Sequence, residues 1–242
     1  MPDRPAMKLP LVITGTIVPQ ANFVHIKDWQ LRRGQYLEAL RFFCKEYTVF
    51  FLENSAYDIE ADNGFEMDRL TVVKLRNADD CHDFGKGYQE FRMLDQFLST
   101  DQAPPRFMKI SGRRILIQID YFQATYARSR WQYFDLWQND GFADTSFFCC
   151  DLAFYKAHLL GIYAQANDSA GAIIEKLAYQ ALAKASNVRF HPVTPLYKGQ
   201  HGTSGNRLKS KYHIPTELRR FFRRLQGKTK MDKRIFDPRK LN

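Results

Sequence analysis

Short apolar runs alternate with amphipathic stretches along the first half of the chain. Leu9–Val18, Thr48–Leu52 and Leu70–Leu75 are apolar runs of strand length, which is typical of buried strands. Between the first two, Gln30–Tyr47 carries its apolar residues at helical spacing, and we predict an amphipathic helix there. This part of the chain therefore predicts a strand, a helix and two further strands.

A second helix and a further strand follow. The segment from Phe84 to about Leu98 opens with two glycines and has one apolar face, as an amphipathic helix does. Phe107–Asp120 contains two apolar pieces, and the second, Ile115–Ile119, alternates well enough for a strand. Short strands separated by amphipathic helices predict an α/β fold, with a central, mostly parallel sheet flanked by helices and joined by right-handed crossovers.

The second half of the pattern is less regular. Phe147–Tyr163 is strongly apolar, Gly171–Ala185 predicts a helix, and Val188–Val193 predicts a last strand. A loop containing three glycines, Gly199–Gly205, follows. No internal repeat or flexible linker precedes about Arg207, so we expect one domain over residues 1–206 and a tail over residues 207–242.

Charge separates the tail from the body. The chain has 36 Lys and Arg against 26 Asp and Glu, a net charge of +10. Thirteen of the basic residues and three of the acidic ones lie in Arg207–Asn242, which leaves 23 of each in the rest. The body is thus neutral. With 45% hydrophobic and 14% aromatic residues overall, the chain has the composition of a protein with a packed core, and it is not disordered.

The tail contains a basic amphipathic helix. Leu218, Phe221, Phe222 and Leu225 have the spacing of one helical face, and four arginines cover the other side. Such a helix suits an anionic membrane surface, and we expect residues 216–225 to contact one. The alternative is a helix docked on its own domain with solvated arginines.

Several classes of protein are excluded by missing patterns. No apolar stretch approaches the roughly 18 residues that a membrane-spanning helix needs, and the first residues lack the basic and apolar segments of a secretory signal. The four cysteines form no CxxC pair, and the six histidines lack ligand spacing, so we expect reduced thiols and no metal centre. A P-loop, a GxSxG elbow and an HExxH motif are all absent.

Candidate ligand-binding residues follow the predicted strands, because ligands on such sheets bind beyond the carboxyl ends of the strands. Thr14, Gly15 and Thr16 end the first strand, and Glu53, Asn54 and Ser55 end the second. The short polar side chains after the second strand suit a nucleoside or sugar hydroxyl.

Two further segments suit a phosphate. Lys86 and Gly87 open a predicted helix, whose first N–H groups attract anions. Lys109-Ile-Ser111-Gly112-Arg113 flanks a tight turn with two cations that can neutralise a diphosphate without a metal. The alternatives are an ordinary helix cap for the first segment and a turn with solvated cations for the second.

Carboxylates near apolar segments are candidates for a general base. They are Asp120, Asp144, Asp151 and Glu175, and for each taken singly a helix cap or an ion-pair partner is the favoured explanation. The glycine-containing loop with His201, Thr203 and Ser204 suits an acceptor-binding lid, although such loops are also simple connections.

Taken together, the segments named above resemble those of a known family. This family is the bacterial glycosyltransferases of O-antigen, lipooligosaccharide and capsule synthesis, which have a GT-A-like fold. The landmarks span roughly residues 10–210, and they are Leu11–Ile17, Arg33-x-x-Tyr36-x-x-Ala39-Leu40, Phe50–Ser55, Gly85-Lys-Gly-Tyr-x-Glu90-x-x-Met93-Leu94, Lys109–Arg113, the helix with Glu175, and Gly199-x-x-Gly202-Thr-Ser-Gly205.

The resemblance implies an enzyme, of hexosyltransferase type, that transfers a sugar from a nucleotide-sugar donor to a glycan or polyprenyl-linked acceptor. Ordinary GT-A enzymes hold a divalent metal with an Asp-x-Asp pair where this chain has Lys109–Arg113. We therefore expect no cofactor, with a divalent metal as the less favoured alternative. We hypothesise that Lys109 and Arg113, with Lys86, neutralise the departing phosphate. The leading candidates for the base of an inverting transfer are Glu175 and Glu90, and Asp120 is the next candidate.

The resulting hypothesis is a cytoplasmic enzyme at the inner face of the bacterial inner membrane, with no nucleic-acid partner. Two alternatives stay open. A basic, aromatic tail also binds nucleic-acid backbones, although the neutral body carries no nucleic-acid motif. A glycosyltransferase fold also serves as a noncatalytic partner in polysaccharide assembly.

Overall fold

The central sheet confirms the predicted α/β class. The computed structural model describes residues 8–19, 24, 26–62, 67–75, 82–199 and 214–232. Among these residues, seven strands form one sheet in the order β10, β6, β9, β4, β1, β2, β3. Strand β9 runs antiparallel to both of its neighbours, and the other pairs are parallel. The strands are β1 (Leu11–Gly15), β2 (Val49–Glu53), β3 (Leu70–Lys74), β4 (Arg106–Ser111), β6 (Gln132–Tyr133), β9 (Phe147–Asp151) and β10 (Val188–Arg189).

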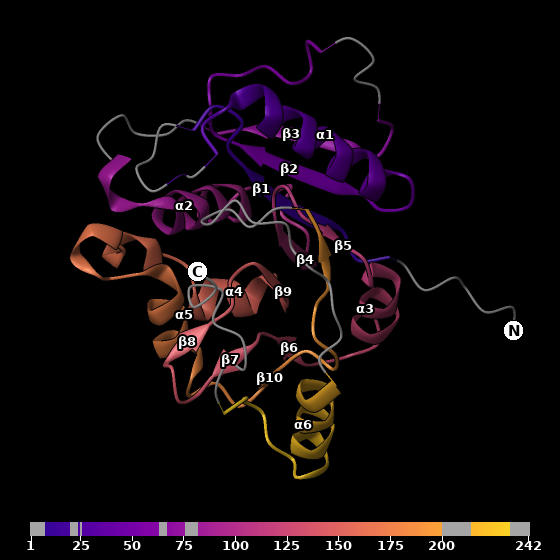
Figure 1. Ribbon diagram of the computed structural model, residues 1–242, viewed down its shortest axis with the longest axis vertical. Helices are drawn as coiled ribbons and strands as arrows, with labels where there is room; N and C mark the ends of the chain where they lie inside the picture. Colours follow the sequence, from indigo (N-terminus) through magenta and orange to yellow (C-terminus); the bar gives the residue numbers. More distant parts are fainter. Residues whose placement is uncertain are drawn as a thin grey trace, which may run out of the picture.

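Helices lie on both sides of this sheet (Figure 1). They are α1 (Trp29–Cys44), α2 (Lys86–Leu98), α3 (Ile119–Tyr126), α4 (Leu152–His158), α5 (Ile174–Leu182) and α6 (Ile214–Leu225), with short 3-10 helices η1 (His82–Phe84), η2 (Ile162–Gln165) and η3 (Asp168–Ala170). Two small antiparallel sheets complete the described part of the chain. They pair β5 (Ile115–Leu116) with β11 (Tyr197–Lys198), and β7 (Leu136–Trp137) with β8 (Phe142–Ala143).

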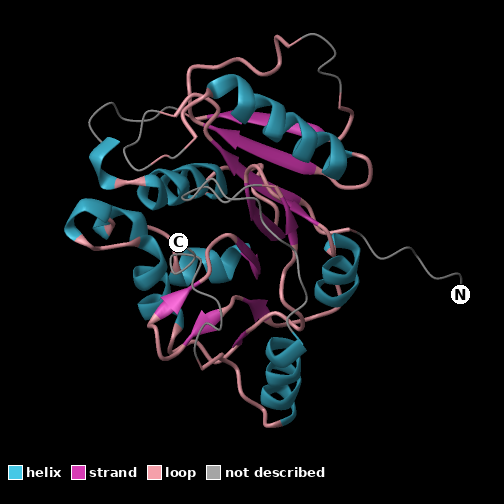
Figure 2. Cartoon of the chain, in the orientation of Figure 1, coloured by secondary structure: helices cyan, strands magenta, loops and turns pink. Residues whose placement is uncertain are grey.

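Alternation along β1 explains the layers. Leu11 and Ile13 belong to an apolar cluster with residues of α1 and α3, whereas Val12 belongs to a second cluster with residues of α2, α4 and α5. Successive side chains of a strand point to opposite faces, so a strand that is apolar throughout is covered on both. The helices in Figure 2 provide that cover on the two faces of the sheet.

Two of the predicted strands are wrong in extent. Only Ile115 and Leu116 of the expected strand Ile115–Ile119 are extended, because helix α3 begins at Ile119. Ile119, Phe122 and Tyr126 recur at helical spacing and are buried, so this segment forms a helix and not a strand. The expected strand Val188–Val193 stops at Arg189.

The tail helix is attached to the body. Residue 206, where we predicted the end of the catalytic domain, lies outside the described residues, so the boundary stays a prediction. After α6 the chain returns to β7, where Met231 N donates to the carbonyl of Leu136 at 2.9 Å. No helix in the described ranges is long and apolar enough to cross a membrane.

Candidate functional site

A pocket lies where the carboxyl ends of β1 and β4 meet the start of α2. Its described lining includes Thr14, Gly15, Thr16, Arg32, Tyr36, Lys86, Gln89, Glu90, Ser111, Gly112, Arg113 and Arg114. Four of these residues are cations and one is a carboxylate, so the described walls attract anions. The volume is about 140 Å³. Because typical small-molecule sites measure roughly 300–1,000 Å³, a ligand of that size would extend past these walls.

Glu90 is the centre of a hydrogen-bonded cluster that joins β1, β4 and α2. Its Oε1 accepts hydrogen bonds from Thr14 Oγ1 at 2.5 Å, Lys109 Nζ at 2.6 Å and Ser111 Oγ at 2.8 Å. Burial by itself opposes ionisation of Glu90, but the charge and hydrogen bond of Lys109 outweigh it and lower the pKa of this carboxyl. Glu90 is therefore a fixed anion and a weak base.

Lys109 lies inside the protein, below the pocket. Its side chain is fully buried, and Nζ donates to Glu90, to Ser111 Oγ at 2.8 Å and to the carbonyl of Thr145 at 2.6 Å. An ammonium has three donor hydrogens. Since all three are used within the protein, Lys109 has none left for a phosphate, and the structure gives it the role of holding Glu90.

The loop after β1 is held by a residue pair that sequence reasoning did not assign. Arg32 Nε donates to the carbonyls of Thr16 at 3.0 Å and Ile17 at 3.1 Å. Tyr36, one turn later on α1, accepts a hydrogen bond from Thr16 N at 2.9 Å. The i, i+4 spacing of Arg32 and Tyr36 is the signal that could have placed both on one buried helical face.

Glu53, Asn54 and Ser55 hold the same loop from its other side. Glu53 is fully buried, accepts from Ile17 N at 3.1 Å and pairs with Lys74 at 2.8 Å. Asn54 accepts from Thr16 Oγ1 at 2.6 Å, and Ser55 Oγ accepts from Val18 N at 3.2 Å. All three predicted donor-binding residues therefore support the site, and they are outside the described pocket lining.

Two of the predicted glycines allow the strand ends to approach. A Cβ at Gly112 would lie 2.5 Å from the carbonyl oxygen of Thr14, and Gly112 N donates to that oxygen at 2.9 Å. A Cβ at Gly15 would lie 2.5 Å from Phe51. Both positions require glycine, because only a residue without a side chain fits between β1 and its neighbours.

The start of α2 is already occupied by a carboxylate of the protein. Asp168, on η3, accepts a backbone hydrogen bond from Lys86, and a Cβ on Gly85 would lie 2.0 Å from Asp168 Oδ2. Gly85 also has a φ of 97°, a conformation that favours glycine. At Gly87 a Cβ would lie 2.4 Å from Ile174. The glycines of this segment thus admit η3 and α5, and Asp168 holds the place that we predicted for a phosphate.

Of the cations that the sequence predicted for a phosphate, Arg113 and Lys86 line the pocket. Arg113 Nη1 donates to Gln35 Oε1 at 2.7 Å, and its guanidinium also has a hydrogen bond with Tyr36, which leaves further donors outside these two contacts. Burial lowers the pKa of Lys86, and the nearby carboxylates Asp168, Glu175 and Glu90 oppose that shift. Both cations lie in the lining that also contains Thr14 and Ser111.

Glu175 has the electrostatics of a base. It lies in the first turn of α5, and burial raises the pKa of its carboxyl, with negative charge on Asp168, Glu90 and Asp144 adding to the shift. A carboxylate with a raised pKa holds a proton more readily and is a better base near neutral pH. Glu175 is within electrostatic range of Lys86, although it is outside the pocket lining itself.

The remaining predicted site residues lie elsewhere. Asp120 is exposed on α3 and accepts a hydrogen bond from Tyr47, which lies two residues before β2. It therefore lies at the amino end of the strands, and the structure does not bring Asp120 to the pocket. Asp151 pairs with Arg106 at the start of β4, at 2.6 Å. His201, Thr203 and Ser204 lie outside the described residues.

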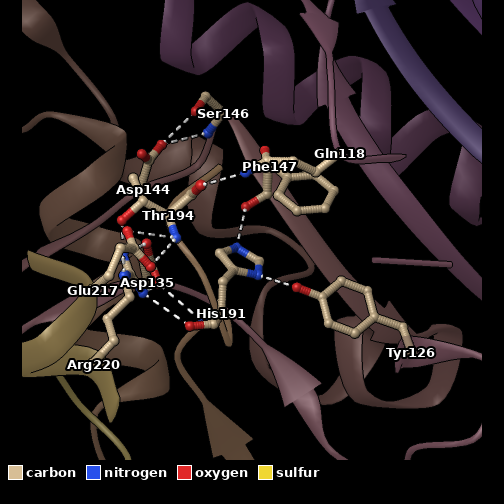
Figure 3. Close-up of polar contacts among 10 residues, drawn as sticks. All are labelled: Gln118, Tyr126, Asp135, Asp144, Ser146, Phe147, His191, Thr194, Glu217 and Arg220. Carbon is tan, nitrogen blue, oxygen red and sulfur yellow. Dashed lines mark hydrogen bonds and ion pairs between the residues drawn. The ribbon is translucent and has the colours of Figure 1, made fainter. Parts of the chain in front are cut away.

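A buried polar network beside the site was missed by sequence reasoning (Figure 3). Arg220 of α6 pairs with Asp135 through two hydrogen bonds, at 2.9 and 2.5 Å, and His191 N donates to the same carboxylate at 3.0 Å. His191 Nδ1 lies 2.5 Å from Tyr126 Oη. Burial lowers the pKa of His191, so the ring is neutral near pH 7. The four residues are far apart in sequence, and no spacing pattern could have joined them.

This network is connected to the Glu90 cluster through a short segment. Asp144 N donates to the carbonyl of Asp135 at 2.9 Å, and the carboxylate of Asp144 accepts from Ser146 N at 2.9 Å. Thr145, between these two residues, supplies the carbonyl that binds Lys109. The Arg220–Asp135 pair and the Glu90 cluster are thus both hydrogen-bonded to the same short segment of chain, residues 144–146.

Comparison with solved structures identifies the fold. An active-site mutant of LgtC aligns with a TM-score of 0.50 and 6% identity, covering 75% of this chain and 72% of LgtC. A galactosyltransferase LgtC complex with donor and acceptor sugar analogs aligns with a TM-score of 0.48 and 4% identity, over 75% and 73% of the two chains. The bifunctional glycosyltransferase WbbM aligns with a TM-score of 0.46 and 9% identity, over 98% of this chain and 47% of WbbM.

The first of these alignments shows a GT-A-like fold, as the sequence predicted. Neither a protein-family model nor a curated protein matches this chain. At 6% identity the likeness concerns the path of the backbone, so the roles of side chains have to be argued from this structure alone.

Proposed function

We propose that this protein is a glycosyltransferase that transfers a sugar from a nucleotide-sugar donor to a growing bacterial surface glycan. The observation that carries the proposal is the cationic pocket at the carboxyl ends of β1 and β4, in a fold shared with LgtC. A donor phosphate would meet Arg113 and Lys86, and the Glu90 cluster would fix the strand ends that surround it. These cations would stabilise the charge that develops on the departing nucleotide.

The proton of the acceptor hydroxyl would pass to Glu175 in an inverting transfer. The sugar–phosphate bond breaks as the acceptor oxygen attacks, and a base with a raised pKa takes up the proton. Glu90 serves this step less well, because Lys109 lowers its pKa. We assign Glu90 to positioning the pocket.

Charge neutralisation by Arg113 and Lys86 in place of a metal is part of the proposal. Transfer that persists in excess EDTA supports it, and loss of activity that Mn²⁺ restores contradicts it. Among the described residues, no group of three or more His, Cys, Asp or Glu side chains is placed to hold a metal ion.

A thermal-shift screen against UDP-, GDP-, dTDP- and CMP-sugars tests the donor class. A ligand at 100 times its Kd stabilises by about 2.7 kcal/mol, or roughly 5–10 °C for a chain of this size. We expect one nucleotide class to give this shift, R113A to abolish it, and R130A, which removes an exposed arginine elsewhere, to keep it. No shift with any of the four classes would contradict the proposal.

The acceptor is proposed to be lipid-linked, with the enzyme at the inner face of the inner membrane. The support is the exposed apolar side of α6, on which Leu218, Phe221, Phe222 and Leu225 are each at least half exposed. Apolar helix faces with neighbouring cations bind anionic lipid surfaces. Activity on a polyprenyl-linked acceptor in vesicles, exceeding that on the free glycan, tests this part.

A further inference from the structure

Helix α6 is packed on the body through its basic side. Arg220 is 1% exposed and paired with Asp135, whereas Ile214 and Leu225 are each 69% exposed. A surface helix ordinarily packs its apolar stripe inward. Here the buried carboxylate of Asp135 binds the arginine instead, and the apolar stripe is left outside along the full length of the helix.

A second pocket lies beside this helix, against strand β10. Figure 1 shows α6 at the β10 end of the molecule, and β10 is the edge strand opposite β3. The pocket has a volume of about 390 Å³. The described part of its wall contains no carboxylate. Its lining combines three cations, Arg189, Arg224 and Lys228, with apolar side chains that include Phe190, Phe221 and Leu225.

The local backbone gathers these cations. At the end of α6 Gly227 has a φ of 67°, and Lys228 N donates back to the carbonyl of Arg223 at 2.9 Å, so the chain turns and brings Lys228 beside Arg224. On the other side of the pocket, the guanidinium of Arg189 lies 3.6 Å from the centre of the Trp131 ring. No ion pair with a described residue neutralises any of the three.

We propose that this pocket binds the phosphate headgroup of an anionic phospholipid while the exposed row of α6 enters the interface of the membrane. The phosphate would meet Arg189, Arg224 and Lys228. Phe221 and Leu225 belong both to the pocket and to the exposed row, so a ligand here has its charged group against cations and its apolar part along the helix. That division matches a lipid better than a free anion.

The pocket thereby specifies how the chain would lie on the membrane. This proposal adds a lipid-binding site to the membrane association suggested under the proposed function. It is independent of sugar transfer, because vesicle binding needs neither donor nor acceptor. The pocket residues are also separate from the described lining of the donor pocket. Failure of one proposal is therefore distinguishable from failure of the other.

Vesicle sedimentation of the full chain tests the site. The vesicles contain phosphatidylcholine with or without phosphatidylglycerol, and the variant is R224A/K228A. The matched control is R41A/K45A, which removes two exposed cations from the corresponding end of α1. Two cations near an anionic surface contribute about 30-fold to binding. We expect that loss for R224A/K228A, a loss below about threefold for the control, and unchanged melting temperatures for both.

Other outcomes overturn the proposal. Equal losses in the two double variants would mean diffuse attraction between a basic chain and an anionic surface. Competition by inorganic phosphate together with no binding to vesicles would mean a soluble anion site. Binding to random duplex DNA that R224A/K228A abolishes, without vesicle binding, would favour a nucleic-acid partner.

Discussion

Replacing Lys109 with methionine separates two roles for this lysine, holding Glu90 and meeting a phosphate. The wild-type ammonium is fully buried and bonded to Glu90 Oε1 at 2.6 Å, Ser111 Oγ at 2.8 Å and the Thr145 carbonyl at 2.6 Å. K109M keeps a long unbranched side chain but removes the charge and all three donors. Glu90 then retains only the hydroxyl donors of Thr14 and Ser111.

The expected cost is large. Removing one partner of a buried ion pair destabilises by about 3–5 kcal/mol, because the other charge stays buried without compensation. That is a substantial part of the roughly 5–15 kcal/mol by which domains are stable. We expect K109M to lower the free energy of unfolding by this amount in urea denaturation. E90Q/K109M should recover part of the loss, since no unpaired charge remains.

Acid unfolding provides a second readout of the same pair. Lys109 depresses the pKa of Glu90, so the stability that this carboxyl contributes is present above its ordinary value near 4.5 and is lost as the pH falls through the lower folded value. Wild type should therefore lose stability in acid more steeply than E90Q/K109M. Urea midpoints measured from neutral to acid pH give the comparison.

The refuting result is specific. If K109M is as stable as wild type but binds the donor weakly, then Lys109 contacts phosphate and the argument from its buried donors fails. K156M, which removes an exposed lysine from the last turn of α4, controls for the general effect of losing a positive charge. Additive losses in the E90Q and K109M double-mutant cycle would also contradict a coupled pair.

Three further predictions concern the base, the tail helix and the start of α2. E175Q should lower the transfer rate about 10²–10⁴-fold at an unchanged melting temperature. The wild-type rate should fall in acid through a pKa above 4.5, because the pKa of Glu175 is raised. Normal turnover of E175Q would exclude this base. R220A should lower the free energy of unfolding in urea by about 3–5 kcal/mol, because it leaves Asp135 unpaired. R220K should restore only part of that loss, because lysine lacks the planar guanidinium. Wild-type stability of R220A would contradict a buried pair. G85A should lower the melting temperature through the strain at positive φ and the contact with Asp168, with D168A relieving only the contact; an unchanged melting temperature would show that the loop adapts.

The sequence grouped the residues that line the pocket at the ends of β1 and β4 better than it assigned roles to them. Gly15, Thr16, Ser111, Gly112 and Arg113 line one pocket because the carboxyl ends of neighbouring parallel strands meet at one edge, which is a rule of topology. The rule does not say which polar residue faces the pocket and which faces the protein. That choice depends on partners distant in sequence.

Glu53 and Lys109 illustrate the difference. Both follow or end apolar strands, and both are charged, so the pattern marks them as ligand-binding candidates. Each is instead fully buried against an opposite charge, Lys74 for Glu53 and Glu90 for Lys109. Asp120 lies away from the pocket for another reason, since it stands on a helix that begins at Ile119, where the pattern predicted the end of a strand.

The sequence by itself determined the layered α/β class, the extent of β1, α1, β2 and β3 to within a few residues, and the amphipathic pattern of the tail helix. Those features follow from local periodicity and from burial of apolar side chains, which the chain carries in its order of residues. Only the tertiary structure decided that Asp168 occupies the start of α2, that Lys109 serves Glu90, and that α6 turns Arg220 inward and its apolar row outward. The physical reason is that a buried charge is stable only beside its partner, and the fold brings partners together from positions that sequence spacing does not connect.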